Sequence, residues 1–196
     1  MIVVVDSGVA NLTSVLAALH RFNVDVVVTS DAEKIKQADR VILPGVGSAG
    51  AAMAKLKERN LVDVLRGLTQ PVLGICLGMQ LLFTNSEEGD VGCLGIIPGT
   101  VSKLPENCGL PVPHMGWNQI MGNVPDHPLM REVEDGSYVY FVHSYAAQVS
   151  DATIAVAEYG TKFSATVGMR NFFGCQFHPE RSSSVGSKIL RNFIGM

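Results

Sequence analysis

The chain has 196 residues, a formal net charge of −3 at pH 7, and 47% hydrophobic against 17% charged residues. This composition excludes an intrinsically disordered chain, and the slightly acidic balance argues against a nucleic-acid-binding protein, which usually has a basic face. A chain of this length is expected to form a single domain over residues 1–196 with a sizeable core. The low charge fits either a sheet buried on both faces or a surface covered by a partner.

The sequence contains no segment that predicts membrane insertion, secretion or a metal site. The longest uncharged stretch, residues 67–86, includes a proline, polar residues and internal glycines, so it predicts a strand, turn and helix. No basic segment precedes the apolar residues at the N-terminus, so no signal peptide is expected. The four cysteines are widely spaced without a Cys-x-x-Cys pair, which is typical of reduced thiols in a cytoplasmic protein.

Apolar runs alternate with helical patterns through the first 85 residues. Strands are expected at residues 2–5, 24–28, 41–43 and 72–75, and helices at residues 12–19, at 49–56 and from Leu77 through Phe83. This alternation predicts an α/β fold, with right-handed βαβ units forming an open, mostly parallel sheet that has helices on both faces.

The second half of the chain has a different pattern. Residues 86–130 contain many Gly, Pro and Asn residues and few periodic runs. Closely spaced strands then follow at residues 138–142, 153–159, 163–169 and 172–177, which predicts a hairpin-rich part with a turn at residues 159–161. A last helix is expected to bury Ile189, Leu190 and Phe193.

Cys76 lies in the densest chemical motif, Gly74-Ile75-Cys76-Leu77-Gly78, at a predicted junction of strand and helix. This pattern is typical of a nucleophile elbow, in which a sharp turn exposes the nucleophile and the glycines avoid clashes. The helix N-terminus favours a thiolate, and the N–H of Leu77 would point toward an oxyanion formed by attack of Cys76 on a carbonyl. The alternative is a buried structural thiol in a glycine-rich turn.

A base and its orienting group are expected in Phe177-His178-Pro179-Glu180, at the end of another predicted strand. Side chains two apart in an extended segment point to the same side, so Glu180 can hold one imidazole nitrogen while the other takes the proton of Cys76. The alternative is a local ion pair at a strand end. His143 is a weaker candidate base because no carboxylate lies within three residues of it.

The loop Pro44-Gly45-Val46-Gly47 ends a third predicted strand, where open α/β sheets place their sites. Its backbone N–H groups could form the second half of an oxyanion hole, although an ordinary turn between strand and helix is the alternative. The loop lacks the Gly-Lys-Ser/Thr ending of a phosphate loop, and the turn at residues 6–11 lacks the dinucleotide fingerprint.

These motifs resemble the class I, or triad, glutamine amidotransferase family over nearly the whole chain, in the family's order Cys, His, Glu. The resemblance implies hydrolysis of glutamine to glutamate and ammonia through a glutamyl thioester, with no cofactor and no metal. It implies a catalytic triad of Cys76, His178 and Glu180, oxyanion positions at Val46 and Leu77, and glutamine-binding positions at Gly47, Gln80, Glu88, His143, Ser144 and Tyr145.

Three further segments, residues 43–48, 113–118 and 140–145, are similar to family members that serve histidine biosynthesis. Those members pass ammonia to a cyclase subunit, which uses a phosphoribulosyl formimino nucleotide to form imidazole glycerol phosphate and aminoimidazole carboxamide ribotide. The resemblance therefore implies a heterodimer with a cyclase subunit, without nucleic acid or membrane partners. It suggests interface positions at Asn11, Trp117, Tyr140 and Arg181.

Three alternatives remain at this point. The chain could be a glutaminase subunit of another synthase, although those usually have a Gly-Gly-rich oxyanion loop. It could be a Cys–His hydrolase of the same fold that acts alone on peptides or γ-glutamyl compounds. It could also be a catalytically silent interaction module, which an intact set of Cys76, His178 and Glu180 argues against.

Overall fold

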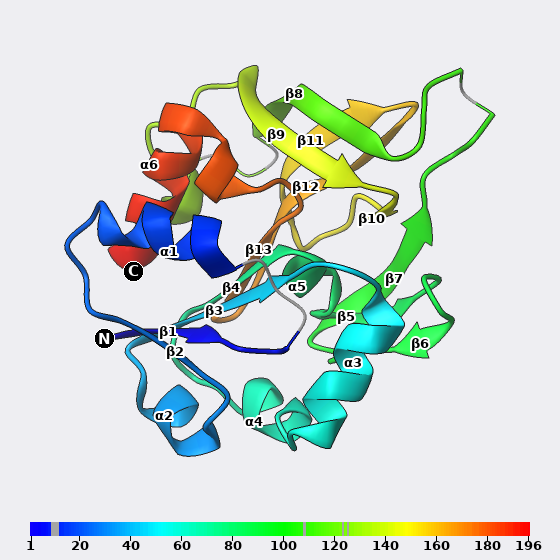
Figure 1. Ribbon diagram of the computed structural model, residues 1–196. Helices are drawn as coiled ribbons and strands as arrows, with labels where there is room; N and C mark the ends of the chain where they lie inside the picture. The colour runs from blue at the N-terminus through cyan, green and yellow to red at the C-terminus, as the bar shows by residue number, and fades with distance from the viewer. Residues whose placement is uncertain (9–11, 108, 123, 125) are drawn as a thin grey trace.

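The computed structural model describes residues 1–8, 12–107, 109–122, 124 and 126–196 (Figure 1). Its centre is a nine-stranded mixed sheet in the order β2-β1-β3-β4-β13-β12-β11-β8-β9. The strands are β1 (Ile2–Val5), β2 (Val26–Thr29), β3 (Arg40–Gly45), β4 (Val72–Cys76), β8 (His114–Gly122), β9 (Ser137–His143), β11 (Thr153–Tyr159), β12 (Thr161–Met169) and β13 (Phe172–Cys175).

The sheet has a parallel half and an antiparallel half. Strands β2, β1, β3, β4 and β13 pair in parallel, and β13, β12, β11, β8 and β9 pair antiparallel. The predicted α/β fold class is confirmed, including the tight turn at residues 159–161 that joins β11 to β12. The predicted strand at residues 172–177 ends earlier, at Cys175.

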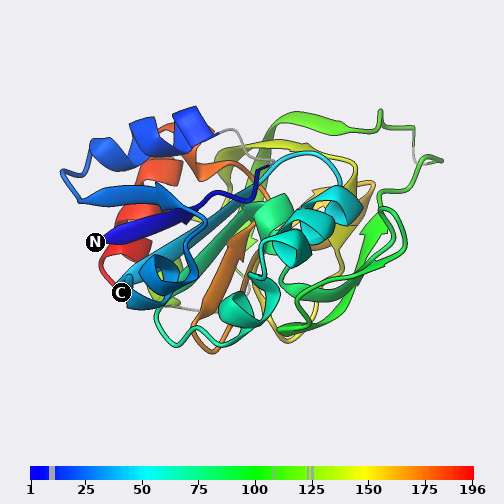
Figure 2. The same cartoon turned by 60° about the horizontal axis from the view of Figure 1, so that its bottom comes forward.

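Helices cover both faces of the parallel half (Figure 2). On one face α1 (Leu12–His20) and α6 (Ser183–Ile194) pack in a cluster that includes Val4, and on the other α2 (Ala32–Gln37), α3 (Ala49–Glu58) and α4 (Val62–Arg66) pack in a cluster that includes Val3 and Val5. Neighbouring residues of β1 thus belong to opposite clusters, as expected for a strand buried on both faces. The predicted inward residues of the last helix, Ile189, Leu190 and Phe193, are all buried.

A second sheet of four strands, in the order β10-β7-β5-β6, lies beside the first. Its strands are β5 (Phe83–Ser86), β6 (Val91–Gly92), β7 (Ile97–Lys103) and β10 (Tyr145–Ala147). The prediction of a helix from Leu77 through Phe83 is wrong at its end, because α5 (Leu77–Gln80) stops after one turn and Phe83 begins β5. The carbonyls of Leu81 and Leu82 accept hydrogen bonds from residues 94, 96 and 97, so they do not continue the helix.

Two short 3-10 helices complete the fold, η1 (Pro128–Met130) and η2 (Pro179–Arg181). Among the helices in the described residues, none is long and apolar enough to cross a membrane. The ends of β3, β4 and β13 lie side by side, because Gly45 pairs with Cys76 and Cys175 pairs with Ile75. The three segments that carry the sequence motifs therefore meet at one edge of the sheet.

Candidate active site

Cys76 occupies a sharp turn between β4 and α5. Its backbone has φ 52° and ψ −110°, in the left-handed region that is rare for a residue with a side chain. A Cβ added at Gly78 would lie 1.8 Å from the carbonyl oxygen of Leu43, and one added at Gly74 would lie 2.6 Å from the backbone of Gly78. Both glycines are therefore needed for this turn, which has the form of a nucleophile elbow.

His178 and Glu180 form a buried pair after the end of β13, and Glu180 lies in the 3-10 helix η2 and not in the extended segment that the sequence predicted. Nδ1 of His178 lies 2.8 Å from Oε1 of Glu180, and the two side chains are only 11% and 5% exposed. Cys76 is the other side chain that interacts with this imidazole. Burial opposes protonation, but hydrogen bonds with Cys76 and Glu180 and attraction to their charge outweigh it and raise the pKa of His178 above its ordinary 6.5.

A cavity of about 260 Å³ opens over Cys76 and brings the predicted site together. Glu180 is the one member of the predicted catalytic, oxyanion and glutamine-binding set that does not line it, and it lies behind His178. Sequence analysis missed Val142 in this lining. The lining residues are Val46, Gly47, Cys76, Leu77, Gln80, Glu88, Val142, His143, Ser144, Tyr145 and His178.

The loop after β3 runs directly beside the elbow. Gly47 has φ +88°, a backbone conformation that favours glycine, and an added Cβ there would have nothing within 4 Å. Val46 is 41% exposed. Oε2 of Glu88 accepts a hydrogen bond of 2.8 Å from the N–H of Ala49, at the start of α3. In this structure Glu88 therefore anchors the end of the loop as well as lining the cavity.

His143 lines the cavity but is not free to act as a base. Its Nδ1 donates to the carbonyl of Tyr145 at 2.8 Å, so Nε2 carries no hydrogen and accepts from Nδ1 of His114 at 2.9 Å. Burial is the main reason that the pKa of His143 falls to about 3 and that of His114 to about 4. Both imidazoles are therefore neutral, and their bonds hold the Tyr145 carbonyl in place.

Gln80 and Gln176 form a second buried contact next to Cys76. Nε2 of Gln80 donates to the carbonyl of Tyr145 at 2.8 Å and to Oε1 of Gln176 at 3.0 Å. Nε2 of Gln176 in turn lies 3.8 Å from Sγ of Cys76. Sequence analysis gave Gln176 no role, and its one available signal was a polar residue within an apolar strand end, two positions before His178.

Three of the four suggested interface residues, Trp117, Tyr140 and Arg181, lie together at the outer side of β8 and β9. The rings of Trp117 and Tyr140 have centroids 6.1 Å apart, and Cζ of Arg181 lies 5.7 Å from the centroid of Tyr140. Around them lies an exposed apolar face, defined by Met115, Trp117, Met121 and Tyr138, which are 50–63% exposed. Asn11, the fourth suggested interface residue, lies outside the described residues.

The remaining described thiols differ from Cys76 in their surroundings. Burial raises the pKa of Cys93 to about 11 and raises that of Cys175 even further. Neither has glycines both two residues before and two residues after it, as Cys76 does, and Cys108 lies outside the described residues. Cys76 is therefore the best nucleophile among the described cysteines.

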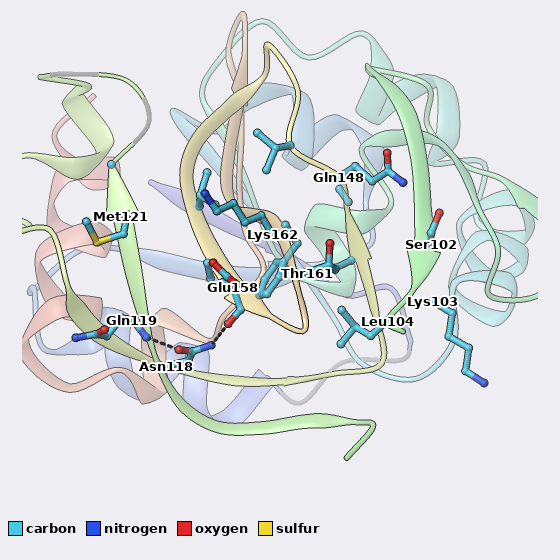
Figure 3. A pocket seen from close by; sticks show the side chains of 17 residues that line it. Ser102, Lys103, Leu104, Asn118, Gln119, Met121, Gln148, Glu158, Thr161 and Lys162 are labelled. Atoms are coloured by element: carbon cyan, nitrogen blue, oxygen red, sulfur yellow. Dashed lines mark hydrogen bonds between the residues drawn. The ribbon is translucent and has the colours of Figure 1, made fainter. Parts of the chain in front are cut away.

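A larger cavity of about 910 Å³ lies between β7 and β10 on one side and β8, β11 and β12 on the other (Figure 3). Asn118 lines it and donates to the carbonyl of Glu158 at 2.9 Å. Neither Cys76 nor His178 lines this cavity. Its polar groups include no nucleophile with a base, so the smaller cavity is the candidate catalytic site.

Comparisons with known proteins agree with this assignment. A sequence model of the family described as "Glutamine amidotransferase class-I" matches residues 3–196. The chain is 53% identical over 211 aligned residues to the "Imidazole glycerol phosphate synthase subunit HisH" of Shewanella oneidensis, covering 100% of this chain and 96% of the relative. It is 54% identical to the protein of the same name from Idiomarina loihiensis, covering 98% and 96%.

Solved structures show the same fold at lower identity. A putative GMP synthase protein from Thermoplasma acidophilum superposes with a TM-score of 0.75 at 20% identity, covering 99% of this chain and 92% of the other. The structure of PurLQS from Thermotoga maritima gives a TM-score of 0.71 at 20% identity, covering 99% and 97%.

Proposed function

The chain belongs to the class-I glutamine amidotransferase family, and from this premise we propose that it is the glutaminase subunit of an imidazole glycerol phosphate synthase. It hydrolyses glutamine to glutamate and ammonia and passes the ammonia to a cyclase subunit in histidine biosynthesis. The observation that carries the proposal is the cavity in which Cys76, His178 and the predicted glutamine-binding residues meet, together with about 50% identity to relatives of that name over their full length.

The site geometry supports a thioester mechanism. His178 takes the proton of Cys76, and the sulfur attacks the side-chain amide carbon of glutamine, so that a C–S bond forms and the carbonyl oxygen becomes an oxyanion. The N–H groups of Leu77 and Val46 stabilise that oxyanion. The oxyanion collapses, the C–N bond breaks, and His178 protonates the departing ammonia. His178 then activates a water that hydrolyses the glutamyl thioester and restores the thiol.

Glu180 acts through His178 in this scheme. Its carboxylate holds Nδ1 at 2.8 Å and so keeps Nε2 turned toward the sulfur. The imidazolium formed in the first step gains a buried counter-charge, in agreement with the raised pKa of His178. Glu180 is therefore proposed as the orienting member of the triad.

A heterodimer formed through the outer face of β8 and β9 is part of the proposal. Four large apolar side chains that are 50–63% exposed gather on this face, and Trp117, Tyr140 and Arg181 lie within it or beside it. Val142, which pairs with Met115 on the same two strands, also lines the catalytic cavity. The proposed interface thus extends from the exposed apolar face to the reacting atoms.

The proposal also assigns a single domain over residues 1–196 and a cytoplasmic location. The family match over residues 3–196 supports the first. The second is supported by the thiols of Cys76, Cys93 and Cys175, which are all free and therefore suit a reducing compartment.

The decisive experiment measures glutamate release from glutamine by the full chain alone, with its cyclase subunit, and with the cyclase subunit plus its nucleotide ligand. We expect strong stimulation only in the complete mixture, because the open space around Gly47 lets the Val46 loop adopt an idle orientation until the partner acts on it. The variant Cys76→Ala should release no glutamate in any mixture. Turnover by that variant would refute the assignment of the nucleophile, and hydrolysis that ignores the cyclase would refute the assigned partner.

A further inference from the structure

Gln176 is fully buried beside the sulfur of Cys76, although the mechanism above does not use it. It follows β13 and precedes His178 by two residues. Its Nε2 lies 3.8 Å from Sγ of Cys76, and its Oε1 lies 3.0 Å from Nε2 of Gln80. A buried amide in this position needs partners for both ends, and these contacts supply them.

The orientation of the Gln176 amide is fixed by two successive hydrogen bonds, which run through Gln80 to the backbone carbonyl of Tyr145. The carbonyl of Tyr145 can only accept, so the group of Gln80 that faces it at 2.8 Å must be the NH2 group. That NH2 group also faces Gln176, which must therefore present its oxygen to Gln80. The NH2 group of Gln176 is left pointing at Cys76.

An N–H donor next to Sγ of Cys76 interacts differently with the thiol and with the thiolate. The neutral thiol can donate to the carbonyl of Val142, which lies 3.8 Å from Sγ. A thiolate has no hydrogen to give, but it accepts from Gln176 and from His178. The contact with Val142 therefore favours the resting thiol, and the contact with Gln176 favours the form that attacks.

We propose that Gln176 is a positioning residue of the glutaminase reaction, which donates to the sulfur of Cys76, stabilises the thiolate once His178 has taken the proton, and keeps it in line with the cavity. The inference rests on the proposed function. It also gives Gln80 a role through Gln176, because Gln80 holds the amide oxygen and so directs the donor to the sulfur.

The other titratable groups near the sulfur act from different sides. His178 reaches it from the end of β13, with Glu180 behind it, and His143 and Glu88 line the same cavity from β9 and from the segment after β5. His143 stays neutral throughout the range in which a thiol titrates, since burial lowers its pKa to about 3. Among the described residues, the side-chain hydrogen bonds of Gln176 go to Gln80 and Cys76 and to none of these four groups.

The test measures the rate at which iodoacetamide alkylates Cys76 in the full chain between pH 5 and pH 10, followed by mass spectrometry of the Cys76 peptide. In Gln176→Met, which keeps the volume but removes the donor, we expect the midpoint of the rate profile to rise by about one pH unit. In the complex with the cyclase subunit, kcat for glutamine should fall about tenfold with KM changed less than about twofold.

A matched control is Thr166→Val on the neighbouring strand β12. Thr166 is also fully buried, and its hydroxyl has no hydrogen-bond partner among the described residues. This substitution should leave the alkylation midpoint at the wild-type value. A shift of the same size in Thr166→Val would show that any disturbance of the sheet moves the midpoint, and it would overturn the proposal.

A second variant, Gln80→Met, removes the hydrogen bond that Gln80 donates to Gln176 and leaves Gln176 itself unchanged. It frees the amide of Gln176 to turn, so the midpoint should rise by less than in Gln176→Met, and the double variant should match Gln176→Met alone. If the folded single variants have the same alkylation midpoint as the wild type, the proposal is overturned even where kcat falls. Alkylation of Cys76 needs no glutamine turnover. A negative result in the alkylation test therefore counts against the role of Gln176, whereas absence of glutamate release by the wild-type complex counts against the proposed function.

Discussion

His178 and Glu180 share a buried hydrogen bond, but the two residues have different roles in the proposed mechanism. The imidazole moves protons in both halves of the reaction, whereas the carboxylate only orients it and balances its charge. Oε2 of Glu180 has no hydrogen-bond partner among the described residues, so the side-chain hydrogen bond of this carboxylate there is the one to His178. The consequences of removing each residue should therefore differ in size.

We expect His178→Ala to lower kcat for glutamine by about 10³-fold or more, because proton transfer to and from the reacting atoms is lost. The loss in Glu180→Gln should be about 10- to 100-fold smaller than in His178→Ala, because its amide can still contact Nδ1 although it carries no charge. Steady-state glutamate release in the complex with the cyclase subunit measures both. Equal losses in the two variants would contradict the separate roles, and circular dichroism of each variant serves as the folding control.

The elbow between β4 and α5 is an element whose backbone could be predicted from sequence. The two glycines around Cys76 signal a turn that approaches another strand, and the structure shows where: Gly78 lies directly against the carbonyl of Leu43 in β3. Strands β1, β3 and β4 could be predicted for a related reason, because a strand buried on both faces has an unbroken apolar run.

Other elements could not be predicted because their burial leaves little trace in the sequence. In α2 the one buried residue is Ile35, so no apolar stripe marks the helix. Strand β7 contains Pro98 and Gly99, which usually interrupt strands. Strand β8 has apolar residues on its exposed side, which removes the alternation expected of a half-buried strand. The contact of Gln176 with Cys76 could not be predicted either, because the two residues are far apart in the sequence and only the parallel pairing of β4 and β13 brings them together.

The close approach at Gly78 leads to a prediction about stability. Gly78→Ala should lower the free energy of unfolding by about 3 kcal/mol or more, because the new methyl group would collide with backbone that has no rotamer to change. Gly50→Ala is the control, since Gly50 lies in α3 with nothing within 4 Å of the added Cβ. It should leave the free energy of unfolding unchanged or raise it by up to about 1 kcal/mol, because alanine is a better helix former than glycine. Urea denaturation of the isolated chain measures both, and equal effects would show that the elbow yields to accommodate a side chain.

At the scale of the whole molecule, the two ends of the nine-stranded sheet differ. Strand β2 forms one end, and β8 and β9 form the other, where the large exposed apolar side chains gather. The proposed catalytic cavity is in contact with that second end, since Val142 of β9 is among its lining residues. A partner bound there would cover apolar surface and stand next to the point of ammonia release. Ammonia could then pass between the two proteins with little exposure to water.

This asymmetry predicts where binding to the cyclase subunit is most sensitive to mutation. Trp117 lies 52% exposed on β8, packed edge-on against Tyr140, and a large aromatic residue in such a position is the usual anchor of an interface. Trp117→Ala should weaken binding by about 2 kcal/mol, or roughly 30-fold in Kd by titration calorimetry, without lowering the stability of the isolated chain. Val28→Ala removes an exposed apolar side chain from β2 at the opposite end, and it should leave Kd unchanged. The reverse pattern, with Val28→Ala weakening binding and Trp117→Ala not, would place the cyclase on the other end of the sheet.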